Sequence, residues 1–486
     1  MSKSFIIDKF VVEPEQYQLF AGLTQGLNEK THHLFSHFFV SSLLAGTKTL
    51  EETWVPVPWR TVREQLRGAS WQELADRGLV SATDYSIGYG RCREYHVDEE
   101  ITQQFLALAP KTWPEYQTKP KVNLMTGKRS VAKPKNIITD ETGHPEPELV
   151  VKAMQSIETC IVDLVAIENH CKELLQVASK LENAADANTA FRRYKNDYIC
   201  LNAIYRCNPV LITEGPFAGF FKYRPAYRVQ MSGRISEIGG GMQSCSRRMK
   251  YVGFPAFSGL NNYDLKNSQP TGLIHQFQQA GLNTDWLEQY VVADKQQYAD
   301  FVGIEVETWK ECLCAVMMGA YIPNHIIESD GSVSRYLKQD ELLQGSNLDA
   351  SVETAYAKLR QVTAPLKEQL DCWHEWLLNV YVPKHCTYSH RNCYLKNATG
   401  KTLNLTALPK QRHIVKSVVA AFLLQGQEAG FIHNLTLQAK DYGFEVLSNQ
   451  HDGLVTLGTI PQSAVRACRP LTETCDVVMV QKPFHL

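Results

Sequence analysis

The sequence lacks an apolar segment long enough to cross a membrane. A spanning helix needs about 20 apolar residues, whereas the longest candidate, Cys312 to Pro323, is shorter and contains a glycine. Residues 1–8 hold only three consecutive apolar residues before Asp8, so we expect no secretory signal. These absences predict a cytoplasmic protein without a membrane partner.

The sequence also lacks an excess of charge of one sign. Its 50 Lys and Arg face 51 Asp and Glu, for a formal net charge of −1. This balance excludes a chain that is basic throughout, but it leaves room for local basic patches. The 13 cysteines are not a disulfide-dense pattern, and we expect reduced thiols.

The composition is that of a globular protein with a substantial core. Of the 486 residues, 44% are hydrophobic and 21% are charged. At roughly 150 residues per domain, this length predicts about three domain-sized units or one enzyme with several lobes.

Residues 1–108 have the pattern of a small winged-helix-like domain. Ser70 and Glu73 form a capping box that opens a helix through Leu79. Alternating residues at 80–86 and 91–97, around Gly88-Tyr89-Gly90, predict a hairpin. Upstream we expect a helix over 34–44, an edge strand at 54–58 and a helical stretch over 60–66. Many winged helices bind DNA and others bind protein, and both interpretations stay open.

Residues 109–148 are rich in proline and lysine and predict an extended basic linker. It is either a solvated tether or a tether that also contacts phosphate. Residues 149–208 predict two helices, over 149–181 and 184–207, packed as a helical hairpin. Residues 209–486 mix strands and helices without a regular βαβ rhythm, so we expect an α+β catalytic body.

Two strand-like segments of this body carry an aspartate. Asp264 lies within residues 262–269, and residues 444–456 predict a hairpin with Asp452-Gly453 at its turn. Two carboxylates brought together in this way could hold two divalent cations about 3.5–4 Å apart for phosphoryl or nucleotidyl transfer. Mg²⁺ prefers such oxygen ligands. Taken alone, Asp-Gly is also ordinary turn chemistry.

Further elements surround the two aspartates in a fixed order. Upstream of Asp264 come Ser232-Gly233-Arg234, a Gly239-Gly240-Gly241 stretch and Gln243. Between the aspartates, Lys310 stands eight residues before Met318-Gly319, and two further segments follow at Ala398-Thr399-Gly400-Lys401 and at residues 423–432. Residues 227–486 therefore resemble the family A DNA polymerase superfamily, which includes the single-subunit phage-type RNA polymerases.

The resemblance implies a right-hand polymerase with palm, fingers and thumb. It places a thumb-like region at 149–208, the palm at 209–284 and 409–486, and the fingers at 285–408. It also implies that Asp264, the Leu265 carbonyl and Asp452 bind two Mg²⁺ ions, with Mn²⁺ as an alternative ion. Asp264 and Asp452 would be the catalytic residues.

The resemblance further implies two sets of binding residues. The nucleotide would meet Lys310, Met318 and Gln269. The primer and template would meet Arg234, Gln243, Arg247, Gln425 and His451, while Arg192, Arg193 and Lys195 would suit a duplex backbone. The implied partners are primer–template DNA and nucleoside triphosphates, with replication proteins in addition.

Four positions depart from the family pattern. Gln269 stands at the distance of a sugar-screening glutamate, Met318 replaces a tyrosine, Val306 replaces an arginine, and Gly453 replaces a glutamate. The choice between deoxyribonucleotides and ribonucleotides therefore stays open.

A second cluster of chemically active residues lies between Cys372 and Cys393. It contains Cys372, His374, His385, Cys386, His390 and Cys393. Zinc takes such ligands, but the spacing is not that of a known tetrahedral site, so zinc binding stays an open question.

The sequence thus favours a template-directed DNA polymerase that replicates a phage, plasmid or mobile element. One alternative is an RNA polymerase, a primase-like enzyme or a reverse transcriptase on the same fold. The other is a DNA-binding replication initiator whose polymerase-like body is inactive.

Overall fold

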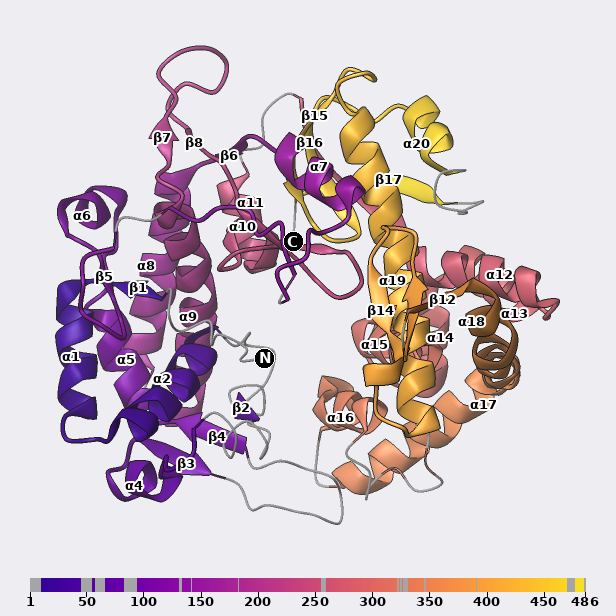
Figure 1. The fold of residues 1–486 in the computed structure, drawn as a ribbon, viewed down its shortest axis with the longest axis horizontal. Helices are drawn as coiled ribbons and strands as arrows, with labels where there is room; N and C mark the ends of the chain where they lie inside the picture. The colour runs from indigo at the N-terminus through magenta and orange to yellow at the C-terminus, as the bar shows by residue number, and fades with distance from the viewer. Residues whose placement is uncertain are drawn as a thin grey trace.

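The structure is a computed structural model of the chain. It describes residues 10–44, 55–56, 66–82, 94–130, 133–140, 142–181, 183–254, 259–320, 323, 326, 331–344, 347–389, 391–469 and 477–484. The described chain is a mixed α and β structure in which small sheets lie among many helices (Figure 1). Among the described residues, no helix combines the length and apolarity that crossing a bilayer requires.

The N-terminal region packs helices against a small sheet. Its helices are α1 (Pro14–Thr24), α2 (Glu29–Leu44), α4 (Trp71–Asp76) and α5 (Glu99–Ala107). Its sheet has the order β2-β4-β3, from strands β2 (Val55–Pro56), β4 (Glu94–Val97) and β3 (Val80–Ala82). Ser70 caps α4 as expected, because its side chain accepts from the Glu73 amide. The second half of the predicted capping box is not formed, since the Ser70 amide donates to Thr31, and the helix ends at Asp76, before Leu79. The predicted hairpin turn at 88–90 and most of the helical stretch at 60–66 lie outside the described residues, so a winged helix stays a prediction.

The prediction of an extended linker over 109–148 is wrong for its first part. This part contains helix α6 (Trp113–Thr118) and strand β5 (Val122–Asn123), which pairs with β1 (Val11–Val12). Trp113 and Leu124 are buried in the same core as the N-terminal helices. The high lysine and proline content of this segment favoured the prediction of a linker, although Trp113 and Leu124 anchor it in the core.

The next region holds the predicted pair of helices, but the first one is broken. The chain forms α7 (Glu148–Ser156), strand β6 (Cys160–Val162), α8 (Leu164–Lys180) and α9 (Ala184–Arg206). After the break, α8 begins with a capped N-terminus, because the Asp163 side chain accepts from the Ala166 amide. Strand β6 then joins β8 (Phe221–Tyr223) and β7 (Val210–Leu211) in a small sheet.

Two of the three cations proposed for a duplex backbone are buried in this helix pair. Arg192 is 8% exposed and pairs with Glu99, while Lys195 is 3% exposed and donates to the Ser42 carbonyl at 2.7 Å. Their role in binding DNA is therefore ruled out by burial, because they join α9 to the N-terminal helices. Arg193 is exposed.

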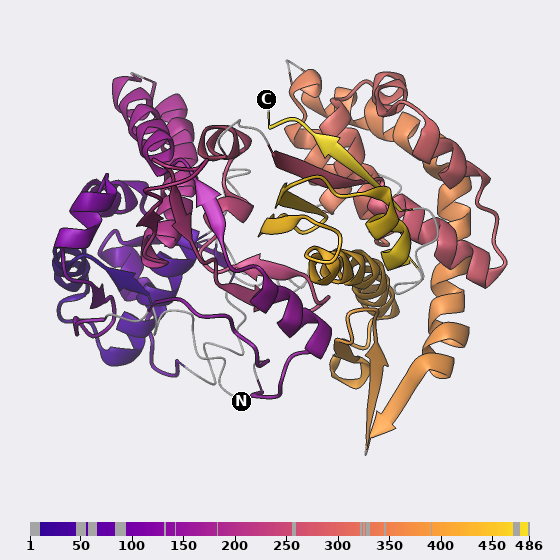
Figure 2. The same ribbon diagram turned by 90° about the horizontal axis from the view of Figure 1, so that it is seen from above.

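A four-stranded antiparallel sheet forms the centre of the C-terminal body. Its order is β15 (Glu445–Asn449), β16 (Gly453–Leu457), β11 (Leu260–Lys266) and β17 (Val478–Lys482). Helices α19 (Arg412–Gln438), α20 (Gln462–Cys468) and α7 pack together beside it. Figure 2 shows this sheet between the N-terminal helices and a second group of helices.

Short elements connect this sheet to the helix pair. They are strands β9 (Tyr227–Val229) and β10 (Ile235–Glu237) and helices α10 (Gly241–Ser244) and α11 (Arg247–Gly253). Strands β9 and β10 form an antiparallel hairpin whose turn carries Arg234.

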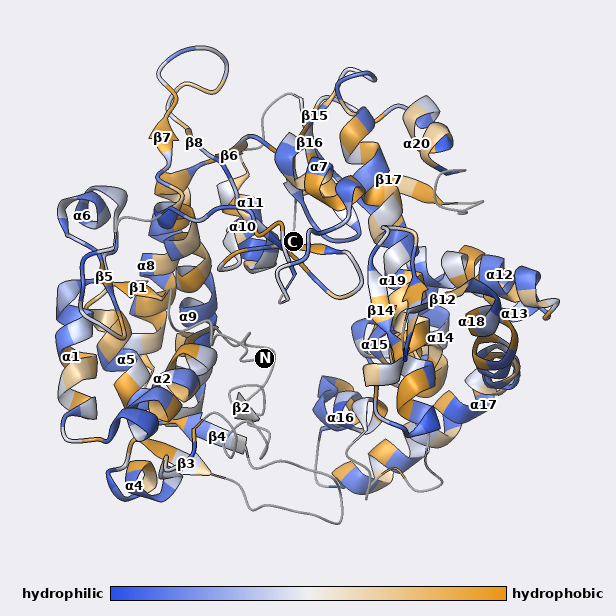
Figure 3. Ribbon diagram, viewed as in Figure 1, coloured by the Kyte–Doolittle hydropathy of each residue, from blue (hydrophilic) through white to orange (hydrophobic). Residues whose placement is uncertain are grey.

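The second group of helices has its own core. It comprises α12 (Ser268–Ala280), α13 (Asp285–Val292), α14 (Lys295–Val302), α15 (Val306–Met317), α16 (Ser332–Gln339), α17 (Leu348–Trp376), the π-helical turn Leu377–Tyr381 and α18 (Val382–His385). Trp309 and Trp373 are fully buried between them. A three-stranded sheet, β12 (Cys386–Ser389), β13 (Asn392–Lys396) and β14 (Thr402–Asn404), leads into α19. Both hydrophilic and hydrophobic residues occur on these helices, as amphipathic packing requires (Figure 3).

A buried polar network joins the helix pair to α11. Asp197 is 1% exposed and accepts from His170 at 2.9 Å, from the Ser246 amide at 2.8 Å and from the Ser246 hydroxyl at 2.6 Å. Ser246 is the residue that caps α11. The network therefore fixes the start of α11, which carries Arg247.

We expect Asp197→Ala to destabilise the protein by about 3 kcal/mol or more, because it leaves buried donors without an acceptor. Denaturant unfolding followed by circular dichroism measures this change. The control is Glu173→Ala on the exposed face of α8, which should cost at most about 0.5 kcal/mol. Equal stabilities of the two variants would contradict the role given to Asp197.

Candidate active site

The central sheet brings Asp264 and Asp452 together. Asp264 lies in β11 directly opposite Gly453, the first residue of β16. The Leu265 amide donates to the Asp452 carbonyl at 2.9 Å, so the backbone next to each aspartate is fixed against the other. The predicted hairpin over 444–456 is confirmed as β15 and β16. Its turn is residues 450–452, so Asp452 lies in the turn as predicted but Gly453 already belongs to β16.

Close packing of the two strands explains the glycine at 453. A Cβ built on Gly453 would lie 2.3 Å from the Tyr263 carbonyl oxygen, which is far inside contact distance. A glutamate here would push β11 away from β16. The departure from the family pattern is therefore a requirement of this strand pair.

Asp452 is the electrostatically strained carboxylate of the site. Burial first, and then the neighbouring charges of Asp264 and Glu428, raise its pKa to about 7, against a smaller lowering by Arg234. No described side chain donates a hydrogen bond to its carboxylate. A carboxylate in this situation gains strongly from a bound cation.

The other two carboxylates each have a cation. Lys482 of β17 forms an ion pair with Asp264, and Arg234 forms one with Glu428. Glu428 is buried on α19 and also accepts from the Ser268 hydroxyl at the start of α12. It therefore joins three elements around Asp452.

The sequence did not predict that Glu428 and Lys482 belong to this site. The available signal for Glu428 was a charged residue inside the apolar run of α19, because such residues are rarely buried unless they are paired. Lys482 had no comparable signal, since only the strand order of the sheet brings it beside Asp264.

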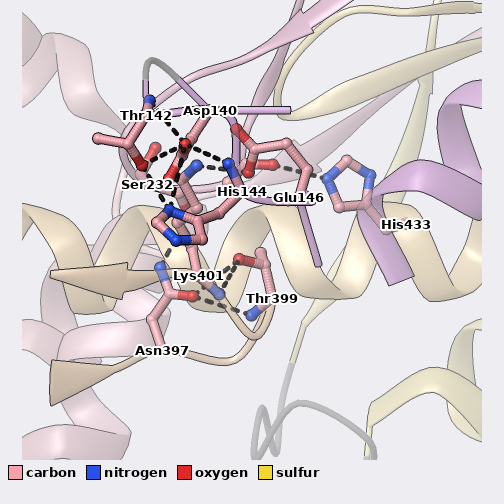
Figure 4. Close-up of polar contacts among 10 residues, drawn as sticks. Asp140, Thr142, His144, Glu146, Ser232, Asn397, Thr399, Lys401 and His433 are labelled. Carbon is pink, nitrogen blue, oxygen red and sulfur yellow. Dashed lines mark hydrogen bonds and ion pairs between the residues drawn. The ribbon is translucent and has the colours of Figure 1, made fainter. Parts of the chain in front are cut away.

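The turn that carries Arg234 is anchored from two sides (Figure 4). Asn397 donates to the Ser232 carbonyl at 2.8 Å, and His433 contacts the Gly233 carbonyl at 2.9 Å. Gly233 has φ of 90°, and a Cβ there would lie 2.1 Å from the Thr399 hydroxyl oxygen. The two predicted segments, 232–234 and 398–401, thus fit directly against each other.

A second anchor ties the end of the predicted linker to this turn region. Lys401 forms a largely buried ion pair with Glu146, which Figure 4 shows beside the same turn. Upstream, Asn136 accepts from the Tyr227 amide at 2.8 Å, and the Ile137 amide donates to the Tyr227 carbonyl at 2.8 Å. Residues 136–140 and 142–146 therefore lie along the body and are not a free tether.

Gln243 and His451, two of the predicted primer and template residues, lie close to the hairpin. Gln243 is 4% exposed. Its side-chain amide accepts from the Glu237 amide and donates to the Ile235 carbonyl and to the Asn449 side chain, so it joins β10 to β15. His451 has φ of 70° at the turn. Burial and the nearby Arg234 and Lys250 charges lower its pKa to about 4, so its ring is neutral near pH 7.

Arg247 and Gln425 are the remaining predicted primer and template residues. Arg247 is exposed at the start of α11, and Gln425 is half-buried in the middle of α19.

The predicted nucleotide-binding residues lie on α15 and α12. Lys310 is exposed on α15 and pairs with Glu307 at 3.0 Å. One turn further, the Cys314 thiol donates to the Gln269 side-chain oxygen at 3.0 Å, so α15 contacts the residues that follow β11. Met318 is half-buried at the end of α15.

A further lysine, Lys295, lies within electrostatic reach of both Lys310 and Lys266. The pKa of Lys295 is lowered to about 8, mainly by burial and then by the charges of Lys266 and Lys310. Sequence reasoning missed Lys266 and Lys295, although Lys266 follows Asp264 by two residues. Together the three lysines make the region beside Asp264 favourable for an anion.

The donors at the two aspartates fit a hard divalent cation. Asp264, Asp452 and the Leu265 carbonyl supply oxygen atoms, which Mg²⁺ and Mn²⁺ prefer. The Asp452 carboxylate, which is not paired with any described cation, is the observation that favours this fit. In contrast, the described residues between Cys372 and Cys393 form no group of three metal-ligating side chains. His390 lies outside the described residues.

Comparison with known proteins gives a remote similarity only. No family model matches the sequence, and no curated protein matches it. One similar solved structure is the polymerase domain of Pol1 from M. smegmatis in complex with DNA primer–template and dNTP. It shares 12% sequence identity, covers 70% of each chain and has a TM-score of 0.42. The similarity concerns the fold at a distant level.

The raised pKa of Asp452 predicts a pH-dependent cost to stability when no metal is present. Its carboxyl titrates near pH 4 in the unfolded chain and near pH 7 in the folded one, so ionisation destabilises the fold as pH rises across this interval. Asp452→Asn removes this cost. We expect its gain in melting temperature in EDTA to grow between pH 4 and pH 7 and then to level off.

Thermal unfolding at a series of pH values measures this gain. The control is Asp441→Asn, which changes an exposed aspartate outside the site and should give no such trend. A gain for Asp452→Asn that is the same at pH 4 and pH 8 would contradict the prediction.

Proposed function

We propose that this protein is a template-directed nucleotidyltransferase, and more specifically a DNA polymerase that uses two divalent cations. The observation that supports this proposal best is the convergence of Asp264 and Asp452 on adjacent strands, with a raised pKa at Asp452. A surface pair of acids without function would have no reason to accept this repulsion.

The residues present would hold the cations as follows. Asp264, the Leu265 carbonyl and Asp452 are the ligands, and Mg²⁺ bound there would stabilise the attacking and leaving oxygens of phosphoryl transfer. Lys310 would bind the triphosphate as a point charge, and Lys266 would add positive charge next to it. Gln269 and Met318 would contact the nucleotide from α12 and α15.

The primer and template would be bound on the opposite side of the aspartates. Arg234 and Gln425 would contact the growing end, and the neutral His451 ring would contribute a hydrogen bond without adding charge. Gln243 would act through the hairpin that it supports, and Arg247 would bind a backbone phosphate. The Glu428 pair would keep Arg234 oriented toward this side.

We also propose the larger assignment of a right-hand architecture. The central sheet would be the palm, the helices from α12 to α18 the fingers, and α8 and α9 the thumb. The N-terminal region would be a winged-helix domain that recruits the enzyme to DNA or to a replication protein. Replication of a phage, plasmid or mobile element is the process that we infer.

Primer extension tests the proposed activity. The purified protein is incubated with a labelled primer on a DNA or RNA template, Mg²⁺, and either dNTPs or NTPs. We expect extension on the DNA template with dNTPs, and a loss of at least 100-fold in Asp264→Ala and Asp452→Ala, because both remove a metal ligand. Arg335→Ala, on the exposed surface of α16, is the control and should keep full activity.

The other outcomes assign the alternatives. Extension with NTPs only would make the protein an RNA polymerase or primase-like enzyme, and extension on RNA only would make it a reverse transcriptase. DNA binding that weakens with salt, without extension in any reaction, would leave an inactive initiator. Full activity of either aspartate variant would refute the two-metal proposal.

A further inference from the structure

Lys482 is placed beside Asp264 by the register of the sheet. Strand β17 pairs with β11 over five positions, from Asn262 opposite Lys482 to Lys266 opposite Val478. Asp264 therefore lies opposite Val480, and Lys482 is its diagonal neighbour. Residues two apart on a strand share a face of the sheet, so these two side chains meet on one face.

Neighbouring contacts fix this strand at both ends. The Gln481 side chain donates to the Asn261 side-chain oxygen at 2.7 Å, next to Lys482. At the other end, Arg469 donates to the Val477 carbonyl at 2.8 Å. The Lys482 ammonium is thus delivered by an ordered strand, although the side chain itself is half exposed.

The pairing changes the charge that the candidate metal site offers. Among the described residues of the site, Glu428 is neutralised by Arg234 and Asp264 by Lys482, so Asp452 alone stays unpaired. A divalent cation bound to Asp264 would lie within a few ångströms of the ammonium. Two like charges at such a distance repel each other even in water.

We propose that Lys482 is an internal counter-cation of Asp264 that a divalent metal ion must displace. It holds the Asp264 carboxylate in one orientation before the metal arrives, and the metal must release it in order to bind. Lys482 is a positioning residue in this scheme, and it weakens the intrinsic affinity of the site for metal. This inference rests on the proposed function only in that it assumes a metal at Asp264.

Titration of the full chain with Mn²⁺, followed by electron paramagnetic resonance of free Mn²⁺, tests the inference without any catalytic step. We expect Lys482→Met to lower the dissociation constant of Mn²⁺ about fivefold or more, because it keeps the aliphatic stem and removes the competing charge. Lys482→Arg should stay within twofold of the wild type. The control is Lys440→Met, an exposed lysine just beyond the C-terminal end of α19, which should change nothing.

A second variant guards against a folding defect. Lys482→Gln also removes the charge, and circular dichroism with melting temperatures shows whether either variant is folded. If the folded variant binds Mn²⁺ no tighter than the wild type, Lys482 is not a competing cation and the inference is overturned.

The aspartate variants separate this outcome from failure of the proposed function. If Asp264→Ala and Asp452→Ala bind Mn²⁺ as tightly as the wild type, the metal is not at this site and both proposals fail. If both weaken binding while Lys482→Met changes nothing, only the role of Lys482 fails.

Discussion

The pairing of β11 with β16 is the constraint on which the rest of the site depends. It fixes Asp264 opposite Gly453 and joins the Leu265 amide to the Asp452 carbonyl, so the backbone positions of the two aspartates are fixed relative to each other. The absence of a side chain at Gly453 is what permits this approach. The backbone geometry thus places the two aspartates near each other. The free energy of strand pairing offsets the resulting electrostatic repulsion.

The surrounding cations compensate the three carboxylates of the site unequally. Arg234 and Lys482 neutralise Glu428 and Asp264, and the remaining negative charge falls on Asp452. Each of the two cations comes from a different element, the β9–β10 turn and β17. The electrostatics of the site therefore report on the placement of elements that are distant in sequence, and a shift of any one of them would alter the charge at Asp452.

Local patterns in the sequence predicted the local structure around the site. The alternation and the Asp-Gly pair in 444–456 predicted the β15–β16 hairpin, and Ser70 predicted a helix start, because both signals act over a few residues. The sequence did not predict that Arg192 and Lys195 are buried, nor that residues 113–124 form a helix and a strand. A charge pattern does not show which face of a segment is covered by other parts of the chain. Glu428 and Lys482 were missed for a related reason. Their roles arise from contacts across about 160 and 220 residues of chain.

The strand order of the central sheet has a consequence for biosynthesis. Strand β11 lies between β16 and β17, and its two partners follow it by about 190 and 210 residues. At a synthesis rate of about 5–20 residues per second, β11 waits on the order of 10–40 s for its neighbours. During this interval both edges of the β11 segment are open to pairing with other chains. The yield of folded protein in a cell will therefore depend on how well that nascent segment is shielded on or near the ribosome.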